Sequence, residues 1–143
     1  MIYQEKPKDF NPVFSIVSCY VEHNGRILLL HRQSQKPEGN RWGLPAGKID
    51  EGESELEAMI REIKEETGQE FSPEALEYLD KVYVKYPEYH FLYHMFRVKL
   101  EEELPVSLSP KEHQDFQWLE PELALQLDLV RDLDECLKLS YNI

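Results

Sequence analysis

Apolar positions in the first part of the chain predict two strands joined by a tight turn. Residues 13–22 are rich in Val, Ile, Phe and Tyr, and residues 26–31 carry an Ile-Leu-Leu-Leu run. The tripeptide His23-Asn24-Gly25 lies between them, and an Asn-Gly pair tolerates the positive φ of a hairpin turn. We therefore expect a β-hairpin whose second strand is buried on both faces.

Patterns further along the chain mix strands with helices. Strands are expected at residues 76–86, 90–100 and 115–119, a short strand or extended piece at 42–47, and helices at 121–127 and 129–139. The polar segments 33–41 and 101–110 are interpreted as loops, the first of them mobile. The mixture predicts an α/β or α+β sandwich.

One further helix is expected from residue 53 or 54 to Thr67. Ser54 followed by Glu57 matches a capping box, and Gly68 stands where a left-handed C-cap is expected. An apolar stripe predicts the face of this helix that docks on the sheet. Its members are Leu56, Met59, Ile60 and Ile63.

The same helix carries three glutamates on the face beside that stripe. Glu62, Glu65 and Glu66 follow i, i+3, i+4 spacing, so their side chains fall together. Like charges gathered on one face repel each other, and a bound cation would neutralise them. Because hard carboxylate oxygens suit Mg²⁺ or Mn²⁺, the spacing predicts a divalent metal site.

Composition limits the classes of function that fit. The chain has 143 residues, 41% of them hydrophobic, which suits one globular domain over residues 1–143. A net charge of −12 argues against nonspecific binding to nucleic acid or anionic membranes. Two distant cysteines, no signal segment and no bilayer-length apolar run lead us to expect a cytoplasmic protein. The oligomeric state stays open.

The acidic helix belongs to a longer motif over residues 47–69. Gly47 is followed after five residues by Glu53, and after seven more by Arg61-Glu62-Ile63-Lys64-Glu65-Glu66-Thr67-Gly68. This spacing resembles the box of the Nudix hydrolases, G-x5-E-x7-R-E-U-x-E-E-x-G-U, where U is apolar. Gln69 departs from the pattern at its last position, where the family prefers an aliphatic residue that packs after the helix.

The segment before the box extends this resemblance. It reads Trp42-Gly43-Leu44-Pro45-Ala46-Gly47, which is similar to the family's W-x-L-P-G-G lead-in, with Ala46 replacing one glycine. Residues 26–32 and 112–119 resemble the strands on either side. The resemblance implies a Nudix α/β/α sandwich, an α/β fold with a mixed β-sheet and the box as a loop–helix–loop motif.

Candidate metal ligands follow from position on the helix. Adjacent carboxylates near a helix end can converge on one ion, which favours Glu65 and Glu66, and Glu62 lies one turn back on the same face. The resemblance implies the same E-x-x-E-E set. The carbonyl of Gly47 is a further candidate ligand.

Two other box residues are expected to support the ligands. Glu53 lies at the helix start, from which it reaches the cluster only indirectly. Arg61 is expected to pair with a nearby carboxylate and hold it in place.

The resemblance implies hydrolysis of a pyrophosphate bond in a nucleoside diphosphate linked to a group X. Metal ions neutralise the pyrophosphate oxygens and lower the pKa of an attacking water, and a carboxylate takes the proton. Glu62 and Glu112 are the candidate bases. Glu112 opens a stretch that resembles the family's downstream E-x5-W, although an exposed loop glutamate is an equally good interpretation.

Other side chains are candidates for holding the substrate. Arg32 and Arg41 are candidate phosphate ligands, because guanidinium binds phosphate in a bidentate manner. Core packing explains the aromatic residues Trp42, Phe116 and Trp118 better than stacking on a base does. The second hairpin carries four tyrosines, which either line a pocket for the base or pack within the hairpin, and the sequence supports both interpretations equally. They are Tyr83, Tyr86, Tyr89 and Tyr93.

Among substrates we favour a small nucleotide, such as a nucleoside triphosphate cleaved to monophosphate and pyrophosphate. The short chain supports this choice, because dimeric ADP-ribose hydrolases of the family commonly carry a longer amino-terminal extension. The Leu-Pro-Ala-Gly lead-in points the other way, so dinucleoside polyphosphate and ADP-ribose hydrolysis stay open. A non-catalytic nucleotide sensor is the other alternative, but such members usually lose a box glutamate. The acidic balance argues against an RNA substrate.

Overall fold

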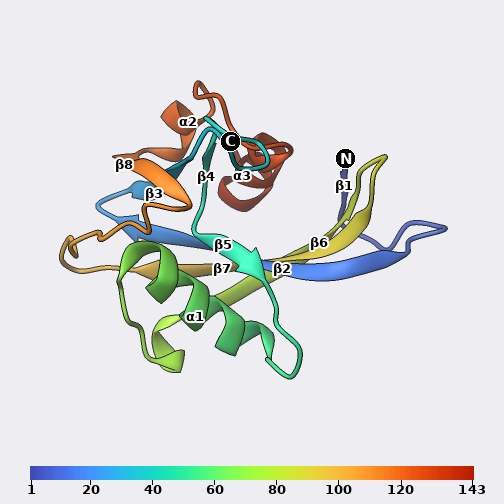
Figure 1. Cartoon of the computed structure of the whole chain (residues 1–143), viewed down its shortest axis with the longest axis horizontal. Helices are drawn as coiled ribbons and strands as arrows, with labels where there is room; N and C mark the ends of the chain where they lie inside the picture. Colours follow the sequence, from blue (N-terminus) through green and yellow to red (C-terminus); the bar gives the residue numbers. More distant parts are fainter.

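The centre of the fold is the long strand β2 (Pro12–His23). In the computed structural model, which describes residues 1–143, β2 pairs in parallel with β7 (His90–Lys99) and in an antiparallel hairpin with β3 (Arg26–Arg32). The sheet runs in the order β1-β6-β7-β2-β3-β4, with β5 against β2 and β8 against β3 (Figure 1). Parallel and antiparallel pairs together confirm the predicted mixed sheet.

The remaining strands are shorter than β2, and three helices complete the fold. The other strands are β1 (Ile2–Tyr3), β4 (Trp42–Gly43), β5 (Ala46–Lys48), β6 (Glu77–Lys85) and β8 (His113–Leu119). The helices are α1 (Glu55–Thr67), α2 (Pro121–Ala124) and α3 (Leu133–Tyr141), with one 3₁₀ turn at Pro73–Ala75. None of these helices has the length and apolar content needed to cross a membrane.

The predicted hairpin is present. Asn24 has φ 51° and Gly25 has φ 76°, both in the left-handed region that a two-residue hairpin turn requires. The Ile-Leu-Leu-Leu run that follows is fully buried in β3. The sequence prediction of a strand buried on both faces is therefore confirmed.

Helices cover both faces of the sheet, and each face has its own core (Figure 1). Neighbouring residues of β3 point to opposite sides, as strand geometry requires. Leu28 packs with Met59 in the core beneath α1. Leu29 packs with Leu137 in the core beneath α3. The α/β/α sandwich expected from the sequence is confirmed.

The C-terminal helices are shorter than the sequence predicts. The pattern favours helices over 121–127 and 129–139, but α2 ends at Ala124 and α3 begins only at Leu133. Asp132 has φ 67°, which no right-handed helix accommodates, so the second helix starts after it.

The segment between the two helices pairs with β4 instead. The Asp128 carbonyl accepts a hydrogen bond from the Trp42 N–H at 2.8 Å, and the Val130 N–H donates to the Trp42 carbonyl at 2.9 Å. These backbone hydrogen bonds hold the segment in an extended conformation. Pairing with β4 therefore outweighs the helix propensity of these residues.

Loop 33–41, expected to be mobile, is anchored to its surroundings. The Nε of Arg32 donates to the Pro37 carbonyl at 2.8 Å. Gly39 passes so close to the Ser34 carbonyl that a Cβ there would overlap it. The loop therefore folds into a compact turn beside β4.

Candidate active site

Helix α1 is fixed at both ends by the caps that its sequence predicts. The Glu57 N–H donates to the Ser54 hydroxyl at 3.1 Å, and the Ser54 N–H donates to the Glu57 carboxylate at 2.9 Å. Gly68 has φ 75°, and its N–H donates to the Lys64 carbonyl. Together with the buried side chain of Met59, these caps hold α1 in place beside β5 (Figure 1).

Arg61 is the centre of a hydrogen-bond network on α1. Its Nε and Nη2 donate to the two oxygens of Glu53 at 2.7 and 2.9 Å, a bidentate pair. Its Nη1 donates to Glu62 at 2.8 Å and lies 3.3 Å from Glu65. Hydrogen bonding to Arg61 lowers the pKa of Glu53 to about 2. One guanidinium therefore orients three carboxylates.

Glu62 points at the backbone of β5. A Cβ on Gly47 would overlap the Glu62 carboxyl group, so glycine is needed at that position. Burial raises the pKa of Glu62, and the charges of Glu65 and Glu112 raise it further, against the opposing effect of Arg61. The carboxylate therefore lies in a partly desolvated and strongly negative environment.

Glu66 is buried where α1 meets β5. Only 4% of its surface is exposed, and its Oε1 accepts a hydrogen bond from the Ala46 N–H at 3.0 Å. Burial raises the pKa of Glu66 well above its usual range, and Glu62 and Glu112 add to this effect. The sequence placed Glu66 on an acidic face beside the apolar stripe, but the structure buries this side chain inside the interface between α1 and β5.

Glu112 reaches the same place from the turn before β8. The Gln33 N–H donates to its carbonyl at 2.9 Å, which ties the turn to the end of β3. Its charge raises the pKa of both Glu62 and Glu66, so the three carboxyl groups lie within electrostatic reach of one another. The fold thus brings a residue from a distant segment to the glutamates of α1.

The donor chemistry of this cluster fits a divalent cation. Carboxylate oxygens are hard ligands, and a cation would offset both the burial and the mutual repulsion that raise the pKa of Glu62 and Glu66. In the arrangement described, no three acidic, histidine or cysteine side chains stand at the spacing of a metal site. Arg61 occupies oxygens of Glu62 and Glu65, so ion binding must exchange some of these hydrogen bonds for coordination.

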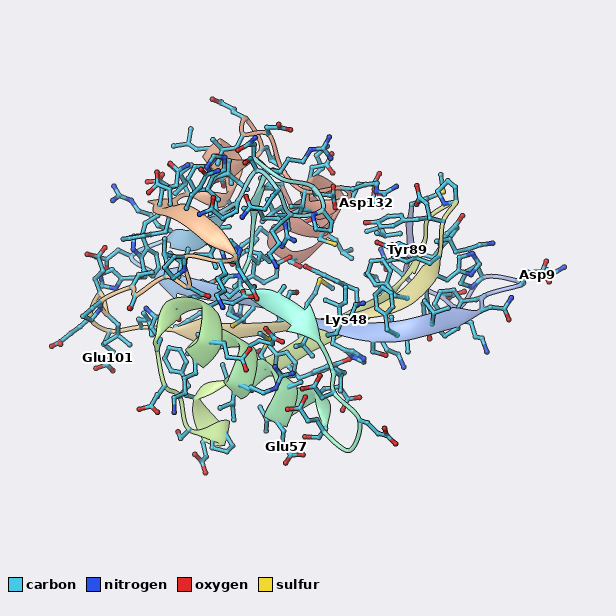
Figure 2. All side chains as sticks on the ribbon, viewed as in Figure 1. Asp9, Lys48, Glu57, Tyr89, Glu101 and Asp132 are labelled. Atoms are coloured by element: carbon cyan, nitrogen blue, oxygen red, sulfur yellow. The ribbon has the colours of Figure 1, made fainter.

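A cavity of about 420 Å³ adjoins the carboxylates on the side of the sheet that carries α3. Ala46 lines this cavity and also bonds Glu66, so the two features are contiguous. Figure 2 shows two elements that border it, the β6–β7 turn with Tyr89 and the start of α3 with Asp132. Much of the wall is apolar or aromatic and includes Leu44, Tyr86, Phe91, Tyr93 and Leu133.

The two candidate phosphate ligands differ in placement. Arg32 lines the cavity, and its guanidinium bonds to the Pro37 carbonyl but to no carboxylate. Arg41 instead donates to Glu38 at 2.8 Å and lies 3.7 Å from Asp128. The structure leaves Arg32 available at the cavity and engages Arg41 in ion pairs.

The aromatic candidates also divide into two groups. Three of the four tyrosines on the second hairpin line the cavity, namely Tyr86, Tyr89 and Tyr93. Trp42 stacks on His31 with ring centroids 4.4 Å apart, and Trp118 packs against the core beneath α1, which confirms packing for both. Phe116 is exposed on β8, so the core packing expected for it is wrong.

Sequence reasoning missed four polar residues that line the cavity. They are Glu38, His113, Arg131 and Asp132. These residues come from three separate segments, and no local spacing links them. Only the position of His113, directly after Glu112 and at the start of a strand, offered a signal in the sequence.

Comparisons with known proteins agree with this geometry. A family model described as NUDIX domain matches residues 10–139. The CTP pyrophosphohydrolase of Escherichia coli (strain K12) is 30% identical over 117 residues, which cover 82% of this chain and 83% of that protein. The solution structure of the E. coli ORF135 protein aligns with a TM-score of 0.76 at 25% identity, over 96% of this chain and 94% of that chain.

A second solved structure, of an Ap4A hydrolase from C. elegans, aligns with a TM-score of 0.73 at 25% identity, over 91% of this chain and 96% of that chain. The chain belongs to the NUDIX family, which confirms the resemblance seen in its box. It is a Nudix pyrophosphohydrolase.

Proposed function

We propose that this chain uses a divalent metal ion, Mg²⁺ or Mn²⁺, to hydrolyse the pyrophosphate bond of a nucleoside diphosphate linked to X. A nucleoside triphosphate is the first candidate substrate, which is supported by the similarity to a CTP pyrophosphohydrolase. The observation that supports this proposal most directly is that Glu62, Glu66 and Glu112 lie close together beside a cavity with aromatic walls. The carboxylates suit a metal-bound pyrophosphate, and the cavity suits a nucleoside.

The box supplies the groups that would hold the ion. These are Glu62, Glu65, Glu66 and the carbonyl of Gly47. When bound, the ion would neutralise the pyrophosphate oxygens and make an attacking water more acidic. Arg61 keeps the carboxylates oriented, and its bidentate pair with Glu53 fixes Arg61 itself.

Glu112 is better placed than Glu62 to take the proton from water. Oxygen Oε1 of Glu62 accepts a hydrogen bond from Arg61, whereas the Glu112 side chain interacts with Glu66 and pairs with no lysine or arginine. A carboxylate without a cationic partner keeps lone pairs available to an incoming water. At the cavity, Arg32 is the cation available to hold a substrate phosphate, because no carboxylate pairs with it.

A screen of nucleotides tests this proposal. The purified chain is incubated with nucleoside triphosphates, dinucleoside polyphosphates and ADP-ribose, with Mg²⁺, with Mn²⁺, or with excess chelator. We expect monophosphate and pyrophosphate from triphosphates when metal is present, and turnover that disappears in chelator and returns with added metal. Full turnover in chelator would refute the metal assignment, and tight nucleotide binding with no turnover of any compound would favour a sensor.

A further inference from the structure

Two carboxylates line the cavity, and they differ in how firmly they are held. Asp132 accepts one hydrogen bond, from the amino group of Met1 at 2.8 Å. Glu38 accepts two, from the Arg131 N–H at 2.7 Å and from Arg41 Nη1 at 2.8 Å. Both bonds reach the same oxygen, Oε1. The carboxylate is therefore fixed in orientation, and its other oxygen, Oε2, has no donor within the protein.

The backbone at Glu38 is held in an uncommon conformation. Its φ is 55°, in the left-handed region that few residues other than glycine adopt. The next residue, Gly39, has no room for a Cβ beside the Ser34 carbonyl, so the turn has little freedom to relax. Strained residues of this kind cluster at functional sites, where the surrounding structure holds them in place.

The carboxylate lies beside surfaces that suit a flat ring. The Arg131 guanidinium carbon is 3.7 Å from the centroid of the Tyr86 ring, and both residues line the cavity. The charge of Glu38 contributes to raising the pKa of Tyr86, which puts the carboxylate within electrostatic reach of that ring. Nucleobases stack on aromatic rings and on guanidinium planes. A hydrogen-bond acceptor next to such planes is placed to meet the edge of a stacked base.

We propose that Oε2 of Glu38 accepts a hydrogen bond from the exocyclic amino group of the substrate base. This inference rests on the proposed function and deepens it, because it makes the chain selective for amino-bearing bases. Cytosine carries an amino group where uracil carries a carbonyl oxygen on the same ring. A carboxylate attracts the first and repels the second, since two acceptors facing each other leave both unpaired. Cytidine nucleotides should therefore be preferred to uridine nucleotides.

The test compares CTP and UTP, which differ in the group on C4 of the pyrimidine ring, amino against carbonyl, and in the proton that uracil carries at N3. We expect kcat/KM of the wild-type chain to favour CTP by about tenfold or more, with most of the difference in KM, because a hydrogen bond to a charged group is gained or lost. Equal values for CTP and UTP would overturn the inference and leave the hydrolase proposal intact.

The variant Glu38→Gln makes the test directional. The amide oxygen must occupy the Oε1 position, since the two donors remain there, so the amide NH₂ takes the position of Oε2. A donor then stands where Oε2 was, and the preference should reverse in favour of UTP. Glu38→Ala, which removes both groups, should bring the ratio close to one.

Asp128→Asn is the matched control. Asp128 also lies near Arg41, at 3.7 Å, but it does not line the cavity, so the CTP preference should be unchanged. An unchanged preference in both Glu38 variants overturns the inference. If the wild type hydrolyses no triphosphate, the proposed function fails, and binding of CMP against UMP to the same proteins decides the role of Glu38 separately.

Discussion

The acidic half of the site and the cavity half are built in different ways. The acidic half consists mainly of neighbouring side chains on α1, oriented by the single guanidinium of Arg61. The cavity half is assembled from β1, loop 33–41, the β6–β7 hairpin and the start of α3, which meet only in the folded chain. Charge dominates the first half and apolar surface the second. In the proposed function, bond cleavage therefore depends mainly on one contiguous segment together with Glu112, and the choice of base depends on segments scattered along the chain.

This division predicts different kinetic signatures for substitutions in the two halves. Changes among the carboxylates should lower kcat, because those groups are proposed to act on the reacting phosphate. Changes in the cavity should raise KM or alter substrate preference, because those groups are proposed to bind the part of the substrate that does not react.

The largest loss is expected for Glu66→Gln. The variant removes a charge proposed to hold the metal ion, and we expect kcat to fall about 1,000-fold with little change in KM. The fold should persist, because the amide oxygen still accepts the Ala46 N–H and a buried charge is removed. Steady-state kinetics with Mg²⁺ and thermal melting measure the two effects.

Glu70→Gln is the control for Glu66→Gln. It makes the same chemical change just beyond α1, where the carboxylate pairs with Lys64 on the surface. Its activity should stay near the wild-type level. Near-normal turnover of Glu66→Gln would contradict the assignment of bond cleavage to the acidic half of the site.

The sequence predicts the acidic half in detail and the cavity hardly at all. Spacing within one helix determines which side chains share a face, so the common face of Glu62 and Glu65 follows from the sequence alone. Glu38 and Asp132 both adopt positive φ, and no pattern of residue types predicts that for a glutamate. Burial of Glu66 is not predicted, because helical periodicity indicates the face of a helix and not the depth of the interface.

Gln69 shows a smaller limit of the same kind. The family pattern asks for an apolar residue there, and the structure confirms that the position is buried, with 4% of its surface exposed. Its Oε1 has no hydrogen-bond partner. The motif predicts where this residue lies, but only the packed structure shows that a polar atom is left unsatisfied.

A smaller loss is expected for Glu112→Gln. If this residue is the base, kcat should fall about 100-fold, because general bases contribute at least that much. The dependence of kcat on pH should lose its acidic limb as well. The three-dimensional structure should be preserved, because the Gln33 N–H bonds the backbone carbonyl of residue 112, which the substitution leaves in place.

Comparison with Glu62→Gln separates the two candidate bases. A fall of less than about threefold in Glu112→Gln, with a large fall in Glu62→Gln, would assign proton transfer to Glu62. The acidic half would then lie entirely within the box, and the contrast between a local and a scattered half would be sharper than proposed.

The smallest effect is expected on stability, from His113, which follows Glu112 in the chain but lines the cavity. Burial, aided by the charge of Arg32, lowers the pKa of His113 to about 4. The unfolded chain binds a proton near pH 6.5, so it holds more protons than the folded chain between about pH 6.5 and pH 4. The neutral, buried form of His113 therefore stabilises the folded chain fully above that pH window, and this stabilisation is lost as the pH falls through it.

At about pH 5 the free energy of unfolding should be about 2 kcal/mol lower than at neutral pH because of this residue. Urea unfolding of the wild type and of His113→Asn at both pH values measures it. The variant cannot take up this proton, so its stability should fall less on acidification, by about the same amount. Equal losses in the two proteins would mean that His113 is already solvated in the folded chain. The cavity would then be wetter and less selective than its aromatic walls indicate, and the difference between the two halves of the site would narrow.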